Sequence, residues 1–168
     1  MLNLSQRGTT LLELLTILSL LALLAAIGIP NFVTLIDKNR LTATFDELHD
    51  SLQAARIHAI TQGKTIEVCA YTQRAECGTD WTKGWSLRAA STQEILRINT
   101  QSNIKGSTHW NGFSKTIRFR ANGSSPTSNG RFIVCGKQEV IGQLIINRQG
   151  RIRESSSEEN RTERRRCP

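Results

Sequence analysis

The sequence lacks the motifs by which most enzymes are recognised. It contains no GxSxG nucleophile elbow, no HExxH zinc motif and no GxxxxGK[ST] phosphate-binding loop. Histidines are scarce, and His49 and His58 are nine residues apart on a predicted helix, so they face opposite sides. The four cysteines include no CxxC pair, which argues against zinc. We therefore do not expect an enzyme, a metal site or a cofactor.

Ionisable residues are almost absent from the N-terminal region. Between Leu11 and Ile29, Glu13 is the sole ionisable side chain in an otherwise apolar run. Nineteen helical residues span about 28 Å, close to the thickness of a bilayer core. A secretory signal peptide, a plain single-pass anchor and a helix retained in an assembly all fit this run. Because a carboxylate is costly inside a membrane, we expect Glu13 to have a function and a partner.

The helix is predicted to continue beyond the apolar run, with a kink at Pro30, and to end near Gln62 before Gly63. Its second half carries apolar residues spaced four and three apart, which is typical of an amphipathic helix that covers a partner surface. These residues are Leu41, Phe45, Leu48, Leu52, Ala55 and Ala59.

The remainder of the chain alternates apolar and polar residues, as strands do. The predicted strands lie in "KTIEVCAY", "GWSLRAA", "EILRINT", "TIRFR", "RFIVCG", "GQLIINR" and "GRIRE". Residues 122–130 read as a loop, and the polar segment 154–168 as a poorly ordered basic tail. The fold class is therefore α+β: a long N-terminal helix, first transmembrane and then amphipathic, packed on an antiparallel sheet.

All four cysteines follow the apolar run, which favours disulfides formed in an oxidising compartment. Cys69 and Cys77 are eight residues apart across a turn-forming segment, so a local bridge between them is easy to form. Cys135 would then pair with Cys167. Four cysteines allow three pairings, and spacing alone leaves the other two open.

Positive charge is concentrated in the C-terminal third. Residues 117–168 hold 11 Lys/Arg against 5 Asp/Glu, and ten of these bases are arginine. Arg151 and Arg153 are predicted on one solvent face of a strand, about 6.6 Å apart, with Arg148 just before the turn. Arg164, Arg165 and Arg166 form a second, mobile cluster that a bridge at Cys167 would hold near the same region.

Three interpretations of these arginines remain open. They could be a solvated surface partly paired with Glu154, Glu158, Glu159 and Glu163, or they could bind acidic lipid or a negatively charged protein component. Guanidinium groups also bind phosphate bidentately, which favours nucleic acid. No aromatic run lies beside the arginines, so we expect contact with the phosphate backbone, without base stacking and with little sequence preference.

The leader "MLNLSQRG" followed by "TTLLELL" resembles the class III signal of type IV prepilins and pseudopilins. The resemblance implies cleavage by a prepilin peptidase between Gly8 and Thr9, so that the helix stays in the mature protein. Thr9 stands where the family usually has a methylated Phe. The resemblance also implies that Glu13 neutralises the N-terminal amine of a neighbouring subunit when pilin helices assemble, since each charge would be costly to bury alone.

The rest of the chain resembles the FimT/GspH-type minor pilins and pseudopilins. The matching segments are "IEVCAY", "DWTKGWSL" (80–87), "IRFRANG" (117–123), "RFIVCG" (131–136) and "GRIR" (150–153). In the FimT-like branch, a "GRxR" pattern is associated with DNA capture during natural transformation. The resemblance thus implies a minor type IV pilin that binds DNA and aids its uptake. The alternative is a structural GspH-like pseudopilin of a type II secretion system, whose arginines contact a partner subunit.

The resemblance also implies the organisation and location of the chain. We expect a single-pass protein of the inner membrane with its globular domain in the periplasm, later incorporated in a pilus or pseudopilus. The expected parts are a leader (1–8), a transmembrane and assembly helix (9–30), an amphipathic helix (31–62), a globular β domain (63–153) and a flexible basic tail (154–168).

Overall fold

The computed structural model describes residues 10–74, 76–102, 105–137 and 139–167. The first element, α1 (Leu11–Gln62), is one continuous helix that includes Pro30. The side-chain amide of Asn31 donates from Nδ2 to the backbone carbonyl of Ile27, 3.0 Å away, one turn before the proline's neighbour. The chain divides into two compact units, Met1–Ile36 and Asp37–Pro168.

In the first unit, α1 is apolar and its side chains are exposed. The helix contains a segment with a mean hydropathy of 2.4, long and apolar enough to cross a membrane by length and composition. Large apolar side chains such as Leu11, Leu12 and Leu23 are 68–78% exposed. An apolar surface of this extent requires a lipid or protein environment.

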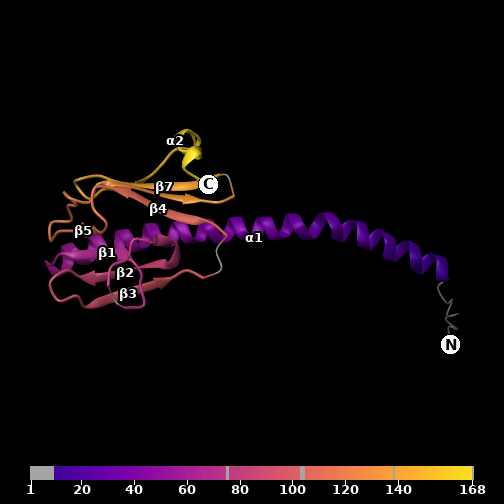
Figure 1. Ribbon diagram of the computed structural model, residues 1–168, viewed down its shortest axis with the longest axis horizontal. Helices are drawn as coiled ribbons and strands as arrows, with labels where there is room; N and C mark the ends of the chain where they lie inside the picture. The colour runs from indigo at the N-terminus through magenta and orange to yellow at the C-terminus, as the bar shows by residue number, and fades with distance from the viewer. Residues whose placement is uncertain (1–9, 75, 103–104, 138, 168) are drawn as a thin grey trace, which may run out of the picture. The chain divides into compact units, whose positions relative to one another are not determined.

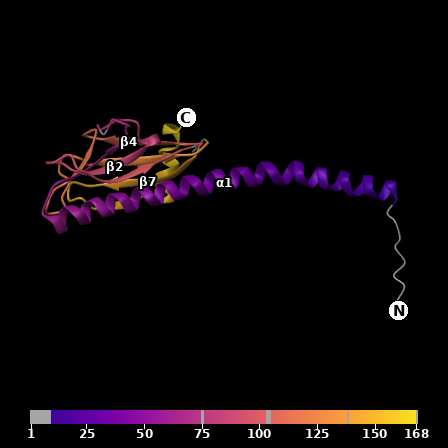
Figure 2. The ribbon, with the colours of Figure 1, turned by 90° about the horizontal axis from the view of Figure 1, so that it is seen from below.

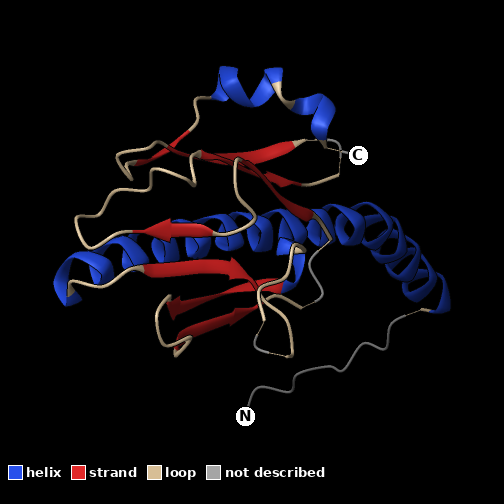
Figure 3. Ribbon diagram, turned by 60° about the vertical axis from the view of Figure 1, so that its left-hand side comes forward, coloured by secondary structure: helices blue, strands red, loops and turns tan. Residues whose placement is uncertain are grey.

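The second unit contains two antiparallel four-stranded sheets (Figures 1 and 3). The first has the order β3-β2-β1-β5 and the second β4-β6-β7-β8. The strands are β1 (Ile66–Ala70), β2 (Gly84–Ala89), β3 (Ile95–Thr100), β4 (Ser107–Gly112), β5 (Ile117–Phe119), β6 (Gly130–Cys135), β7 (Val140–Ile146) and β8 (Ile152–Glu154). A short helix η1 (Trp81–Lys83) precedes β2, and α2 (Ser157–Thr162) and η2 (Arg164–Arg166) follow β8.

The second half of α1 covers the core of this unit. Figure 2 shows the strands on one side of that part of the helix. The predicted apolar stripe is confirmed, because all six of its residues are buried: Leu41, Phe45, Leu48, Leu52, Ala55 and Ala59. The helix packs with strand residues such as Phe119, Phe132 and Leu144, each 0% exposed. Burial of each large apolar side chain contributes roughly 1.5–3 kcal/mol, which is why the stripe fixes the α+β architecture.

The tryptophans of "DWTKGW" belong to the same core. Trp81 lies edge-on to Phe132 with ring centroids 4.7 Å apart, and Trp85 is 0% exposed. Trp110, from the second sheet, also contacts Phe132 at 4.6 Å. These aromatic contacts join η1 to the second sheet, so the motif has a packing role.

A buried carboxylate on the outer face of the first sheet accepts hydrogen bonds from three neighbouring side chains. Glu67 of β1 is 1% exposed and accepts hydrogen bonds from Arg88, Arg118 and Thr116 at 2.7–2.9 Å. Burial raises the pKa of Glu67, but the hydrogen bonds from Arg118, Arg88 and Thr116 outweigh it and hold that pKa below its ordinary value. Arg118 therefore forms a structural ion pair with Glu67.

The C-terminal segment is ordered, so the prediction of a poorly ordered tail is wrong. Ser156 and Glu159 form a reciprocal capping box at the start of α2. Cys135 and Cys167 form a disulfide that fastens the segment to β6, and Cys69 and Cys77 form the local bridge. Composition had indicated disorder because the segment is polar, yet caps, ion pairs and a covalent bond replace the missing apolar contacts.

Candidate nucleic-acid interface

Two glycine-containing turns lie in contact at one end of the second unit. In the first, residues 120–123, the Gly123 N–H donates to the Arg120 carbonyl at 2.7 Å. In the second, residues 147–150, the Gly150 N–H donates to the Asn147 carbonyl at 2.9 Å. The backbones meet where the Ser125 N–H donates to the carbonyl of Arg148 at 3.0 Å. We call residues 120–125 and 147–151 the paired turns.

Gly150 allows this close approach. It has φ +75°, in the left-handed region, and a Cβ atom at this position would overlap the carbonyl oxygen of Gly123. The first residue of the "GRIR" motif is therefore required by the contact between the turns. Gly150 thereby fixes the spacing of Arg148 and Arg151, which lie on either side of it in the sequence.

Replacement of Gly150 by Ala tests this role. Gly63 offers a matched control, because it has φ +62° but nothing within 4 Å of an added Cβ. We expect Gly63→Ala to cost about 1–2 kcal/mol of unfolding free energy, for the left-handed backbone alone. Gly150→Ala should cost about 2–4 kcal/mol, because backbone overlap is added to the same conformational strain. Urea unfolding of both variants measures the difference, and equal losses would contradict the steric argument.

The paired turns present three exposed arginines: Arg120, Arg148 and Arg151. Within the described part of the chain, none of the three side chains has an ion-pair or hydrogen-bond partner. The Arg151 backbone N–H donates to Asn147 Oδ1 at 2.9 Å, which fixes the start of β8. These three guanidinium groups offer planar donors of the kind that suits phosphate.

Two residues of this region were not predicted from the sequence. Arg120 lies far from Arg148 along the chain, and the contact between the turns brings their backbones together. Arg56, on α1, donates from Nε to the Gly123 carbonyl at 3.1 Å and so ties the first turn to the helix. The "IRFR" alternation marks Arg120 as exposed, but sequence periodicity carries no information on which distant turn lies beside it.

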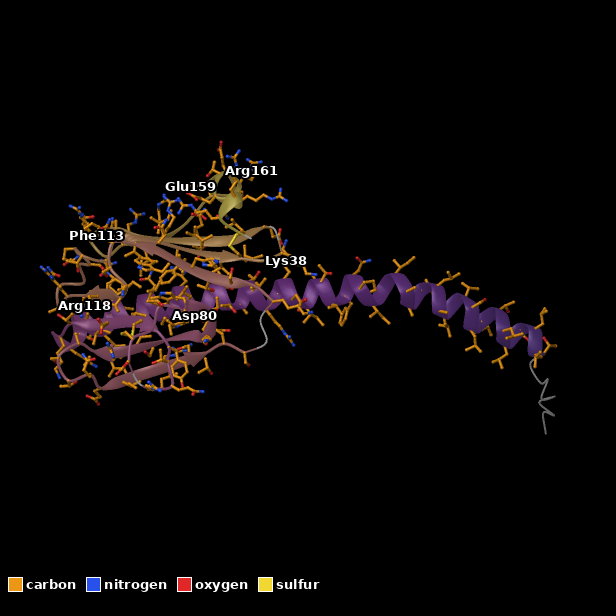
Figure 4. All side chains as sticks on the ribbon, viewed as in Figure 1. Lys38, Asp80, Phe113, Arg118, Glu159 and Arg161 are labelled. Carbon is orange, nitrogen blue, oxygen red and sulfur yellow. A yellow bond between two sulfur atoms is a disulfide. The ribbon has the colours of Figure 1, made fainter. Side chains whose placement is uncertain are left out.

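Arg153 is exposed as predicted, but it is paired. Its Nη1 and Nη2 contact the two carboxylate oxygens of Glu159 at 3.0 and 2.7 Å. On the same face of the sheet, Arg131 Nη1 contacts Glu163 at 2.9 Å. Figure 4 shows Glu159 in the C-terminal segment, on the side of the second sheet away from α1. Two arginines on this face, Arg153 and Arg131, are therefore paired with acidic side chains: Glu159 of α2 and Glu163, the residue after α2.

The Glu159 carboxylate stays charged over the whole physiological range. The hydrogen bond from the Arg153 guanidinium, with help from the Ser156 N–H, holds the pKa of Glu159 at about 2. A depressed pKa in the folded state stabilises α2 docking above the ordinary value of about 4.3. This contribution is lost as pH falls from there through about 2, so neutral and mildly acidic conditions leave Arg153 paired.

Arg164, Arg165 and Arg166 do not join the paired turns. Arg164 lines a groove with Val140 and Ile141, at the first residues of β7. Arg148 is two residues beyond the last residue of β7, and a seven-residue strand is about 20 Å long. The bridge to Cys135 places the tail arginines toward the opposite end of the sheet, so the expectation of one combined arginine region is wrong.

The remaining predicted residues belong to the N-terminal unit. Gly8 and Thr9 lie outside the described residues. Glu13 is in the first turn of α1 and exposed, and its side chain has no partner among the described residues of this single chain. A partner in another subunit is compatible with that exposure.

Comparison with known proteins agrees with this architecture. The family model described as "Type II transport protein GspH" matches residues 44–150. A crystal structure of the type IV minor pilin FimU of Pseudomonas aeruginosa aligns with a TM-score of 0.59 and 24% identity, over 77% of this chain and 93% of that one. A second crystal form of FimU gives a TM-score of 0.57 and 24% identity, over 76% and 96%. No curated protein matches the sequence.

Proposed function

The chain belongs to the GspH family of type II transport proteins, and from this premise we propose that it is a minor type IV pilin that binds DNA. Its fold is that of minor pilins and pseudopilins, which are structural proteins. The proposed site is the paired turns, with Arg120, Arg148 and Arg151 on successive phosphates. Binding at the pilus would aid DNA uptake in natural transformation.

The observation that carries this proposal is the set of three exposed, unpaired arginines on two turns in fixed contact. Among the described residues, acidic side chains pair with Arg118, Arg131 and Arg153 elsewhere in the unit, but not with these three. The planar guanidinium fork is pre-organised for the oxygens of a phosphate, and contacts to phosphate read no base edges. The proposed binding is therefore largely independent of sequence.

Anisotropy of a labelled DNA duplex with the full chain in non-ionic detergent micelles tests the proposal. With three phosphate contacts, log K should fall against log[salt] with a slope near −2.7. A rise from about 50 to 200 mM salt should then weaken binding roughly 40-fold, equally for unrelated sequences. Absence of binding at low salt would contradict the proposal.

A structural pseudopilin of a type II secretion system is the second candidate. The description of the matching family favours it. In that role the arginines of the paired turns would contact an acidic surface of a neighbouring subunit. Loss of these arginines would then reduce protein secretion and leave transformation unchanged, which is the reverse of the outcome expected for a DNA-binding pilin.

Both candidates require the same N-terminal processing and assembly. We propose that a prepilin peptidase cleaves between Gly8 and Thr9. Before assembly, the chain would be anchored in the inner membrane with its second unit in the periplasm. Glu13 would then pair with the free amine of a neighbouring subunit, because a buried carboxylate and a buried amine are tolerable only together.

Replacing Gly8 by a bulky residue should leave the full-length precursor in the membrane. The reason is that the scissile bond would no longer fit a peptidase that requires a small residue before it. Immunoblots of membrane fractions measure the ratio of precursor to mature chain. N-terminal sequencing of the mature protein that starts near Ile27 would instead indicate an ordinary signal peptide.

A further inference from the structure

Phe113 is an apolar side chain left almost entirely in water. It is 90% exposed, and the next most exposed large apolar side chain described in the second unit, Ile57, is 57% exposed. Figure 4 places Phe113 at the end of the second unit that also carries Arg118. An aromatic ring displayed in this way contributes nothing to the core and is free to contact a ligand.

The backbone around Phe113 is held in place. Its N–H donates to the carbonyl of Asn129 at 3.3 Å. The indole N–H of Trp110 donates to the carbonyl of Ser114, the residue after Phe113, at 2.6 Å. Phe113 therefore lies on a loop that these two hydrogen bonds stabilise.

The order of the strands places Phe113 at the same end of the second sheet as the paired turns. Gly112 pairs with Gly130, Gly130 with Ile146, and Ile146 with Ile152, so these residues form one row across the end of the sheet. Phe113 follows Gly112 on β4, and Asn147 and Arg148 follow Ile146 on β7. Two strand spacings separate β4 from β7, about 10 Å.

A shallow groove lies at the same end of the second sheet and is lined by one arginine of the paired turns. It has a volume of about 420 Å³, and its lining includes Asn129, Arg131, Asn147 and Arg148. The carbonyl of Asn129 also accepts a hydrogen bond from the Phe113 N–H, so the backbone of Phe113 adjoins this groove. Lys115 lines a second groove that includes Phe113. A cationic side chain therefore lines the groove that includes Phe113, and two arginines line the neighbouring groove.

From this arrangement we propose that the site takes single-stranded DNA, with Phe113 stacked on a base while Arg148 and Arg151 hold the adjacent phosphates. The inference rests on the proposed DNA binding and names the form of DNA that the site prefers. A duplex hides the faces of its bases within its own stack, whereas a single strand offers each face to an aromatic side chain. Every base has such a face, so stacking adds affinity without sequence preference.

The test compares a thymidine homopolymer with a duplex of the same length, using the full chain in non-ionic micelles. Phe113→Ala should weaken binding of the homopolymer about tenfold, the scale of one lost stacking contact, and change duplex binding less than twofold. Phe113→Trp should retain the affinity for the single strand. Ile98→Ala, at an exposed apolar side chain of β3, is the matched control and should change neither affinity.

The outcomes separate the inference from the proposed function. If Phe113→Ala leaves both affinities unchanged while Arg148→Gln with Arg151→Gln weakens both, stacking is overturned and DNA binding by the arginines stands. If Phe113→Ala impairs filament assembly alone, Phe113 is a subunit contact and the inference fails. If the parent chain binds neither DNA, the proposed function itself is contradicted.

Discussion

Replacing Arg148 and Arg151 together with glutamine is expected to weaken duplex DNA binding roughly fifty-fold at about 0.1 M salt. Each guanidinium that neutralises a phosphate releases about 0.9 counterion, so the salt slope should flatten by about two units. Both side chains are exposed and have no ion-pair or hydrogen-bond partner among the described residues, so the variant should unfold at the same urea concentration as the parent. Anisotropy titrations at several salt concentrations measure both effects.

A charge-matched variant distinguishes a site from general basicity. Arg74→Gln with Arg97→Gln also removes two exposed positive charges, from the part of the unit that carries the first sheet. It should leave the slope unchanged and reduce affinity less than twofold. Transformation should fall with the loss of affinity in the first variant, while pilus assembly persists. If the two double variants weaken binding equally, the paired turns are not the site and the pseudopilin candidate gains support.

Removing the Cys135–Cys167 disulfide, by replacing both residues with alanine, should destabilise the second unit by about 3–4 kcal/mol. The bridge closes a segment with a sequence separation of 32 residues, and in the chain-entropy model it restricts the unfolded state by that amount. The thermal midpoint should fall by roughly 10 °C. Circular dichroism melts of the full chain in micelles measure the shift.

The Cys69–Cys77 bridge provides the comparison. Its sequence separation is only 8, so replacing both cysteines with alanine should cost less, about 2–3 kcal/mol. Cys69 and Cys135 are both buried, which makes the loss of packing similar in the two variants. A larger loss on removing the Cys69–Cys77 bridge would show that native contacts, rather than loop length, determine the contribution of the two bridges.

Local pattern was enough to predict the long helix and the face that it buries. The spacing of Leu41, Leu48 and Ala55 repeats with the period of a helix, so it specifies one side of α1 whatever the rest of the chain does. The short separation of Cys69 and Cys77 likewise favoured their bridge. The alternation around Ile152 predicted that Arg151 and Arg153 would be exposed, and both are.

The sequence by itself therefore determined the helix, the α+β class and the exposure of the arginines, because these depend on periods of two to four residues. The tertiary structure alone decided which arginines are available. Glu159 reaches Arg153 through the fold of a segment that composition marks as disordered, and the Cys135–Cys167 bridge holds the tail arginines toward the other end of the sheet. Arg120 stands with Arg148 because two turns distant in sequence meet across Gly150. Such pairings depend on strand order and long-range contacts, which local periodicity does not encode.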